Sequence, residues 1–329
     1  MITIKEIAKL ANVSGATVSR VINNAEYVSD EVREKVMKIV DEHQYVPSEH
    51  AKALRTKQSK VIGVILPKIS TETASRIVNG INETLASSGY QIILATSDLN
   101  LLNEIKFLKL FKSRQVEGII LNATNTSTEL LEEVKKLTIP FVAIGQKFPD
   151  ESFVTYHNYE VAKGLTSYLI NKGHKKIAFI GVDEKDVAVG YERKKGYLDT
   201  MKEFSLPIDE NWIKTGSFDM TFGDEAMKSI MNHSLSKPTA VFAVTDRLAI
   251  GAMRYLKKNN YSIPKDLAIV GIGASELGEF VEPSLTTVDF NNEEAGREAA
   301  QLIINKIKNK NIENNKIILN YRLIERDSV

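Results

Sequence analysis

The sequence contains no cysteine, which excludes a disulfide framework, a thiolate metal site and a cysteine nucleophile. The absence also fits a reducing compartment. No stretch approaches the roughly 20 apolar residues that a membrane-spanning helix requires. The N-terminus has no basic segment followed by an apolar run, so it lacks the pattern of a secretory signal. These absences predict a cytoplasmic protein that does not enter a membrane.

The sequence also has no excess of charge of either sign, because 43 basic residues balance 42 acidic ones and leave a formal net charge of +1. Affinity for nucleic acid therefore cannot be argued from bulk charge and must come from the placement of individual side chains. At 329 residues the chain exceeds one ordinary domain. A small domain followed by a larger one is a natural division.

Signatures of catalysis and metal binding are absent as well. No GxGxxG or Walker loop follows the first apolar strand, VIGVILP, and no nucleophile elbow occurs. The histidines are scattered without ligand spacing, at His43, His50, His157, His174 and His233. The sequence therefore predicts no enzyme, no catalytic residue, no metal site and no cofactor.

The first 45 residues have the pattern of three short helices. Thr3 and Glu6 form the spacing of a capping box, and Ile4, Ile7, Ala8 and Leu10 are expected to face inward. The segment Asn12-Val13-Ser14 should break this first helix. Ser29 is expected to cap a third helix whose first turn holds Asp30 and Glu31. Val32, Val36, Ile39 and Val40 should pack this helix back on the other two.

The second helix has a small, polar outer face. Ser14 is a suitable N-cap, and Val18, Val21 and Ile22 supply the buried face. The outer positions are Gly15, Ala16, Thr17, Ser19, Arg20 and Asn23. Such a helix after a tight turn suits a helix-turn-helix reader in the major groove, where the fork of Arg20 can reach guanine O6 and N7. The helix pattern alone leaves a three-helix bundle for protein contacts equally open.

The identities of the residues favour the interpretation of this segment as a DNA-binding domain. The run TIKEIAKLANVSGATVSRVIN resembles, almost position for position, the DNA-binding segment of the LacI/GalR family of bacterial transcription regulators. Tyr45-Val46-Pro47 followed by AKALRTKQS resembles the hinge of that family. With the α/β pattern described below, the resemblance covers essentially the whole chain. It implies a DNA-binding domain at residues 1–46, a hinge at 47–59 and a ligand-binding and dimerisation domain at 60–329.

The resemblance also implies which residues bind DNA. In the head these are Thr3, Ile4, Ser14, Gly15, Ala16, Thr17, Ser19, Arg20 and Asn23. In the hinge, Leu54 would wedge a central base step of the minor groove, and Arg55 and Lys57 would contact phosphates. From composition alone this polar segment is a flexible linker in which Leu54 has no special role. The expected partner is a pseudo-palindromic operator bound by a homodimer.

Beyond Val61 the pattern alternates between apolar strands and amphipathic helices. Strands are expected at VIGVILP, YQIILATSD, VEGIILNAT, IPFVAIG, KKIAFIGVD, residues 212–215, PTAVFAVTD and DLAIVGIG. Helices are expected around residues 74–85, 101–111, 127–137, 161–170, 191–204, 222–230, 248–256 and 292–308, and KIILNYRLIER is expected to form a closing strand pair. Two such units in series predict an α/β fold with two parallel-sheet lobes and a ligand cleft between them.

The resemblance places several residues in that cleft. Arg193 matches a family arginine that grips ligand hydroxyls, and Phe218 matches an aromatic stacking position. Thr245 and Asp246 end a strand at the cleft. Thr73, Ala74 and Ser75 stand where relatives often carry bulky aromatics, which predicts a roomier or more polar mouth on the first lobe. Gly273 and Ala274 replace an aspartate of many sugar-responsive members, so Glu276 or Asp246 are the candidates to replace it.

The expected function is that of a repressor of a carbohydrate-utilisation operon, controlled by a small sugar or sugar phosphate. The stretches VGIGASE and ISTETAS resemble the sucrose-operon repressors of the family. A purine or a phosphoprotein remains an alternative effector. A second alternative is a carbohydrate-binding protein of the periplasmic type without a DNA function. With no apolar heptads after the last expected strand, the sequence predicts a dimer and not a tetramer.

Overall fold

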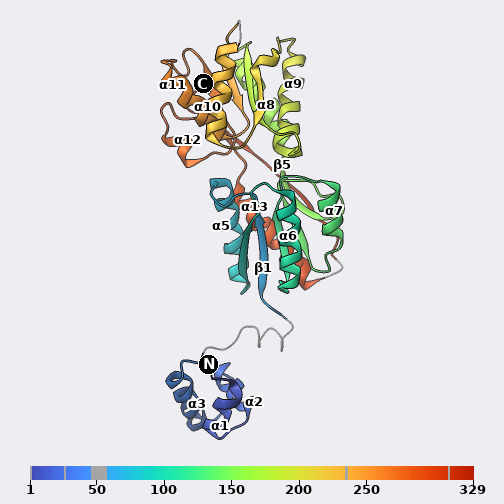
Figure 1. Ribbon diagram of the computed structural model, residues 1–329, viewed down its shortest axis with the longest axis vertical. Coiled ribbons are helices and arrows are strands. Elements are labelled where there is room, and N and C mark those ends of the chain that lie inside the picture. Colours follow the sequence, from blue (N-terminus) through green and yellow to red (C-terminus); the bar gives the residue numbers. More distant parts are fainter. Residues whose placement is uncertain (1, 26, 46–57, 234–235, 310–311) are drawn as a thin grey trace. The chain divides into compact units, whose positions relative to one another are not determined.

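The computed structural model describes residues 2–25, 27–45, 58–233, 236–309 and 312–329. The chain divides into two compact units, residues 1–60 and 61–329 (Figure 1). The first is called the head and the second the effector unit.

The described part of the head consists of α1 (Ile4–Ala11), α2 (Gly15–Ile22) and α3 (Asp30–Glu42). Its small core contains Ile7, Ala8, Ala11, Val18, Val21 and Val36. Leu10 does not face inward as expected, because it is 54% exposed. Ala11 takes that place, since it lies four residues after Ile7 and three after Ala8 on the same helical face.

The ends of the helices explain why the head folds as it does. The side chain of Thr3 caps α1 and that of Ser14 caps α2, as the sequence predicts. Ser29 occupies the N-cap of α3, but its side chain makes no capping hydrogen bond. From within α3, Arg33 donates to Asn24 Oδ1 and to the carbonyl of Ala25, both at 2.7 Å. These two bonds tie the turn after α2 to α3.

The first lobe of the effector unit is built on a six-stranded sheet with the order β11-β5-β4-β3-β1-β2. Its strands are β1 (Val61–Leu66), β2 (Gln91–Thr96), β3 (Gly118–Asn122), β4 (Phe141–Ile144), β5 (Ser152–Tyr156) and β11 (Lys316–Leu319), all paired in parallel. Its helices are α5 (Glu72–Ser87), α6 (Leu101–Ser113), α7 (Thr128–Lys135) and α13 (Asn292–Lys308). Strand β5 was not anticipated from the sequence.

The second lobe has a parallel sheet with the order β7-β6-β8-β9. Its strands are β6 (Ile177–Val182), β7 (Ile213–Gly216), β8 (Ala240–Ala243) and β9 (Ala268–Val270). Its helices are α8 (Asn158–Asn171), α9 (Arg193–Glu203), α10 (Met220–His233), α11 (Asp246–Lys258) and α12 (Glu276–Phe280). The α/β architecture with two parallel-sheet lobes is therefore confirmed.

Two local expectations are wrong. The helix expected at 191–204 begins as a π-helix, η1 (Val187–Glu192), and becomes α-helical only at Arg193. The closing strands do not pair with each other: β11 joins β5, whereas β12 (Arg322–Ile324) pairs with β10 (Thr287–Asp289) in a separate antiparallel ribbon. Both strands are short with one half-buried face, and such a pattern does not specify a partner strand.

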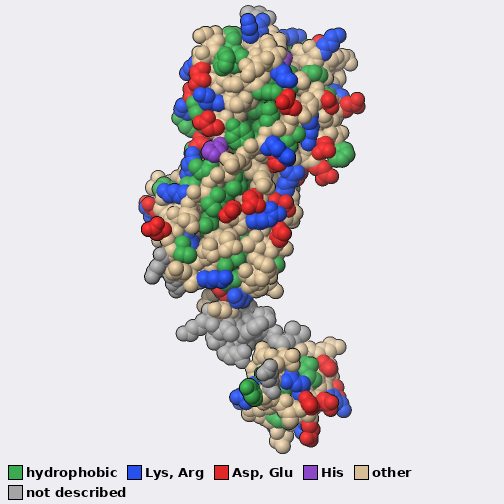
Figure 2. Space-filling model, turned by 180° about the vertical axis from the view of Figure 1, so that it is seen from behind, with side chains coloured by type: hydrophobic (Ala, Val, Ile, Leu, Met, Phe, Trp, Pro, Cys, Tyr) green, Lys and Arg blue, Asp and Glu red, His purple; other side chains and the backbone are tan. Residues whose placement is uncertain are grey.

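Figure 2 shows acidic and basic side chains intermingled over the visible face of the effector unit. This distribution agrees with the balanced composition. Among the described residues, no helix combines the length and apolar character needed to cross a membrane.

Candidate functional site

The first candidate surface is the outer face of α2 in the head. Ser14 Oγ accepts a hydrogen bond from the backbone N–H of Thr17 at 3.1 Å and lies 2.9 Å from the Thr17 hydroxyl. Ala16, Arg20 and Asn23 are exposed, whereas Gly15, Thr17 and Ser19 are partly exposed. Asn23 Nδ2 donates to the Ser19 carbonyl at 2.5 Å. A short polar face with one long cation, Arg20, in the last turn of α2 is thus open to a partner.

The beginning of α1 lies next to the beginning of α2. A methyl group placed on Gly15 would be 3.8 Å from Ile4 Cγ2, and Ile4 is half-buried against the head core. Thr3 is exposed, and its backbone N–H donates to Glu6 Oε2 at 2.8 Å. This backbone hydrogen bond, with that from the Thr3 hydroxyl, lowers the pKa of Glu6. The hinge candidates Leu54, Arg55 and Lys57 lie outside the described residues.

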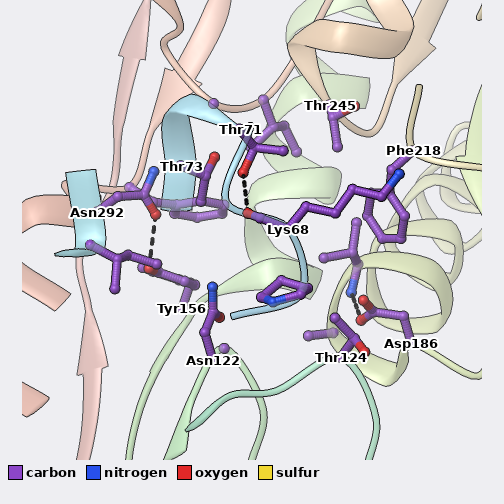
Figure 3. Close-up of a pocket in the computed structure, with 18 of the residues that line it drawn as sticks. Lys68, Thr71, Thr73, Asn122, Thr124, Tyr156, Asp186, Phe218, Thr245 and Asn292 are labelled. Carbon is purple, nitrogen blue, oxygen red and sulfur yellow. Dashed lines mark hydrogen bonds between the residues drawn. The ribbon is translucent and has the colours of Figure 1, made fainter. Parts of the chain in front are cut away.

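The second candidate site is a cavity of about 200 Å³ in the effector unit, lined by residues of both lobes (Figure 3). Among its walls are Lys68, Thr73, Asn122, Gln146, Tyr156, Asn158, Asp186, Arg193, Phe218, Thr245, Asp246, Arg247, Gly273, Phe290 and Asn292. The loop after β1 and the ends of β3 and β5 contribute from the first lobe. The segments that begin η1, α10 and α11 contribute from the second.

Arg193 is the central cation of the cavity and is only 5% exposed. Its Nε donates to Asn158 Oδ1 at 2.8 Å, and one Nη donates to the carbonyl of Val244. The guanidinium lies 5.2 Å from the centre of the Phe290 ring, an arrangement that favours a cation–π contact. Burial lowers the pKa of Arg193 to about 10, and Asp186 opposes that change. The side chain therefore stays charged at neutral pH.

Asp246 lines the cavity but its oxygens already have partners. They accept hydrogen bonds from the Thr287 hydroxyl at 2.5 Å, the Ser275 N–H at 2.7 Å and the Ser275 hydroxyl at 2.9 Å. Burial raises the pKa of Asp246, and these hydrogen bonds counteract that rise. Glu276 is exposed and does not line the cavity. Neither carboxylate therefore presents a free oxygen to the cavity.

The other expected ligand residues divide between the cavity and the core. Thr73 and Phe218 line the cavity, as does Gly273. Thr245 lines it too, with its hydroxyl accepting from Leu248 N–H at 3.3 Å, so that it also caps α11. Ala74 does not line the cavity: it is 1% exposed and packs into the main core. In the first turn of α5, neighbouring positions point to different sides, which is why Thr73 and Ala74 separate.

Several polar residues of the cavity were missed from the sequence. Gln146 of the first lobe donates to Asp186 of the second at 2.7 Å, and the Tyr156 hydroxyl donates to Asn292 at 2.8 Å. Burial raises the pKa of Asp186. Asn122 and Tyr156 end parallel strands, and Gln146 follows one closely. The rule that ligands bind beyond the carboxyl ends of parallel strands is the signal that could have found them.

The side chains that line the cavity are of the kinds that bind a polar organic molecule. Amides, hydroxyls and a buried guanidinium face a space bordered by Phe218, Tyr156 and Phe290. Among the residues that the structure describes, no group of three His, Asp or Glu side chains could hold a metal ion.

Comparison with known proteins gives matches over both units. Residues 3–48 match the profile of bacterial regulatory proteins of the lacI family, and residues 166–329 match that of the periplasmic binding protein-like domain. The chain is 31% identical over 328 residues to the HTH-type transcriptional regulator RegA of Clostridium saccharobutylicum, covering 99% of this chain and 98% of that protein.

Two further matches bear on the cavity. The chain is 31% identical over 332 residues to the HTH-type transcriptional repressor PurR of Vibrio atlanticus, covering 100% of this chain and 99% of that one. It also resembles the solved structure of the transcriptional regulator CelR in complex with cellobiose, with 28% identity, a TM-score of 0.76 and complete coverage of both chains.

Proposed function

Because the chain belongs to the lacI family of bacterial regulatory proteins, we propose that it represses a carbohydrate-utilisation operon and responds to a sugar or sugar phosphate in the effector cavity. The family assignment makes it a DNA-binding transcriptional regulator and not an enzyme. The observation that carries the proposal is the cavity wall, where Arg193 and amide side chains from both lobes face one space. Such groups suit the hydroxyls of a sugar.

The head provides the DNA contacts in this proposal. Helix α2 enters the major groove, and Arg20 donates to guanine O6 and N7. Thr3, Ser14, Thr17 and other polar groups near the starts of α1 and α2 contact phosphates. Leu54 wedges a base step of the minor groove as in the family hinge, and Arg55 and Lys57 contact phosphates. Paired copies of α2 then require a pseudo-palindromic operator.

Exposed apolar side chains support a homodimer. Ile93 is 45% exposed on β2, an edge strand of the first lobe, and Phe280 is 77% exposed on α12. Leu94 and Leu277 accompany them on the same two elements. Apolar side chains on an unpaired edge strand favour burial against another protein surface, and a second copy also supplies the second α2 that a palindrome needs.

Ligand binding changes operator affinity by altering contacts between the lobes. Gln146 and Asp186 join the lobes at the cavity, and Lys147 Nζ lies 2.7 Å from Glu192 Oε1 beside it. A ligand that binds the closed arrangement better shifts the population toward it. Coupling of about 1–3 kcal/mol is enough for tens-fold changes in affinity. A purine is the alternative effector, favoured by the similarity to PurR and by the aromatic ring of Phe218.

Operator binding by the full chain and by the variant Arg20→Ala tests the proposal. Promoter fragments with palindromes should be retained at physiological salt, and Arg20→Ala should weaken specific binding by about 1–3 kcal/mol while random DNA is bound almost as before. Lys35→Ala, an exposed cation on α3, is the matched control and should change specific binding little. Equal losses on specific and random DNA would remove Arg20 from base recognition. Failure to retain any promoter fragment would favour a carbohydrate carrier.

A further inference from the structure

The charged side chains of the effector cavity are not all neutralised by their neighbours. Arg193 lies near Asp186, and Asp246 has its hydroxyl and amide donors. Glu72, on the cavity wall, forms an ion pair with Arg76 and accepts hydrogen bonds from the Glu276 N–H at 2.9 and 3.0 Å. The remaining charged groups of the wall are Lys68 and Arg247.

Lys68 and Arg247 come from opposite lobes. Lys68 follows β1 in the first lobe, and Arg247 lies in the first turn of α11 in the second. Both are half-buried. Figure 3 shows the Lys68 side chain extending across the cavity toward Phe218 of the second lobe. Within the described parts of the chain, neither cationic group has a side-chain hydrogen bond or an ion pair.

The acid near both cations is Asp219, at the start of α10. Its oxygens accept from the Ser217 hydroxyl at 2.7 Å and from the Phe222 N–H at 2.8 Å. These two bonds are the main cause of its lowered pKa, and Lys68 and Arg247 lower that pKa further through their charge. Both cations therefore interact with the same carboxylate. Its oxygens already accept hydrogen bonds at the start of α10. Each lobe supplies one cation there, and after the charge of Asp219 a net charge of about +1 remains.

We propose, on the basis of the function inferred above, that the effector is a sugar phosphate whose phosphate group binds between Lys68 and Arg247. The net positive charge attracts a phosphate group, and the guanidinium fork of Arg247 can donate to two phosphate oxygens while Lys68 adds a point charge. The sugar ring then lies toward Arg193 and Phe218. Because each lobe supplies one cation, the phosphate favours the closed arrangement of the lobes, and an unphosphorylated sugar lacks this contribution.

Thermal unfolding of the full chain with matched ligands tests the phosphate site. The probes are glucose 6-phosphate with glucose, sucrose 6-phosphate with sucrose, glucuronate as a carboxylate, and inorganic phosphate. At equal millimolar concentrations, a phosphorylated sugar should raise the melting temperature more than its neutral partner. Lys68→Gln and Arg247→Gln should each weaken binding of that phosphate ester about tenfold. The control Lys106→Gln, an exposed cation on α6, should leave binding unchanged.

Four outcomes would overturn the phosphate site. The first is equal stabilisation by neutral and phosphorylated sugars, and the second is stronger stabilisation by glucuronate than by any phosphate. The third is a phosphate effect that survives both substitutions, and the fourth is no shift of the melting temperature with any phosphate probe. Operator retention without ligand is measured on the same protein. If it persists while phosphate selectivity is absent, the phosphate site fails and the repressor function stands; if operator retention itself is absent, the repressor function fails.

Discussion

The head and the effector unit use their polar side chains in opposite ways. Every charged or polar side chain that is buried among the described residues belongs to the effector unit. In the head, the capping bonds of Thr3, Glu6 and Ser14 reach only three residues along the chain and remain exposed. In the cavity, the bond from Arg193 to Asn158 spans 35 residues and that from Tyr156 to Asn292 spans 136, and both are buried.

This difference separates two kinds of functional surface. The exposed face of α2 can exchange water for DNA without rearranging the head, because its own hydrogen bonds are local. The cavity side chains stabilise the fold and also face the ligand, so that changing one affects both stability and binding. Removing a buried partner leaves other polar groups unsatisfied, which costs far more than removing an exposed one.

Arg193→Ala should have the largest effect. It leaves Asp186 buried without its neighbouring cation and removes the donors to Asn158 and Val244, so the effector unit should lose roughly 3–5 kcal/mol of stability. Urea unfolding followed by the fluorescence of Trp212, the one tryptophan of the sequence, reports this unit alone. The exposed Arg114→Ala on the same unit is the control. A loss below about 1 kcal/mol for Arg193→Ala would place this guanidinium outside the stabilising network.

Glu104→Gln should have the next largest effect, and it depends on pH. Glu104 is fully buried, and desolvation raises its pKa to about 7 although Asn125 donates to it at 2.8 Å. Since its pKa is higher in the folded than in the unfolded chain, stability is lost as pH rises from the ordinary carboxyl range to about 7. The loss should be on the order of 3 kcal/mol.

The uncharged glutamine should be free of this loss. Urea midpoints of Glu104→Gln and the unchanged protein should therefore agree more closely near pH 5 and diverge by pH 8, with the variant more stable there. The head, in which no buried acid is found among the described residues, should not contribute to the divergence. Parallel curves for the two proteins would show that Glu104 keeps an ordinary pKa in the folded state.

The contrast in chain distance also explains what the sequence could predict. The caps of α1 and α2 and the outer face of α2 follow from spacing within about two turns, and the structure has them where the pattern puts them. The cavity joins segments from Lys68 to Asn292, and no local pattern shows that Tyr156 meets Asn292. Arg193 and Phe218 were found because a family resemblance carries such long-range information.

The site residues and strand partners that the sequence did not predict correctly have the same physical origin. Ala74 was assigned to the cleft by alignment with bulky residues, but its small side chain packs into the core beneath α5. Lys68 and Asp186 gave no signal, since a single charge in a loop is usually solvated. The partners of β11 and β12 depend on which sheet edge is free, and an apolar run of three or four residues does not carry that information.

Thr3→Ala should have the smallest effect and tests the local character of the head. Losing the capping hydroxyl should cost α1 about 1 kcal/mol, so its backbone amides should exchange with solvent about fivefold faster while those of the effector unit stay unchanged. Ser29→Ala is the matched control, because Ser29 stands at an N-cap without a capping hydrogen bond. Similar acceleration in α1 and α3 would mean that the cap residue acts through backbone conformation. A larger effect for Thr3→Ala assigns the difference to the hydrogen bond that only α1 has.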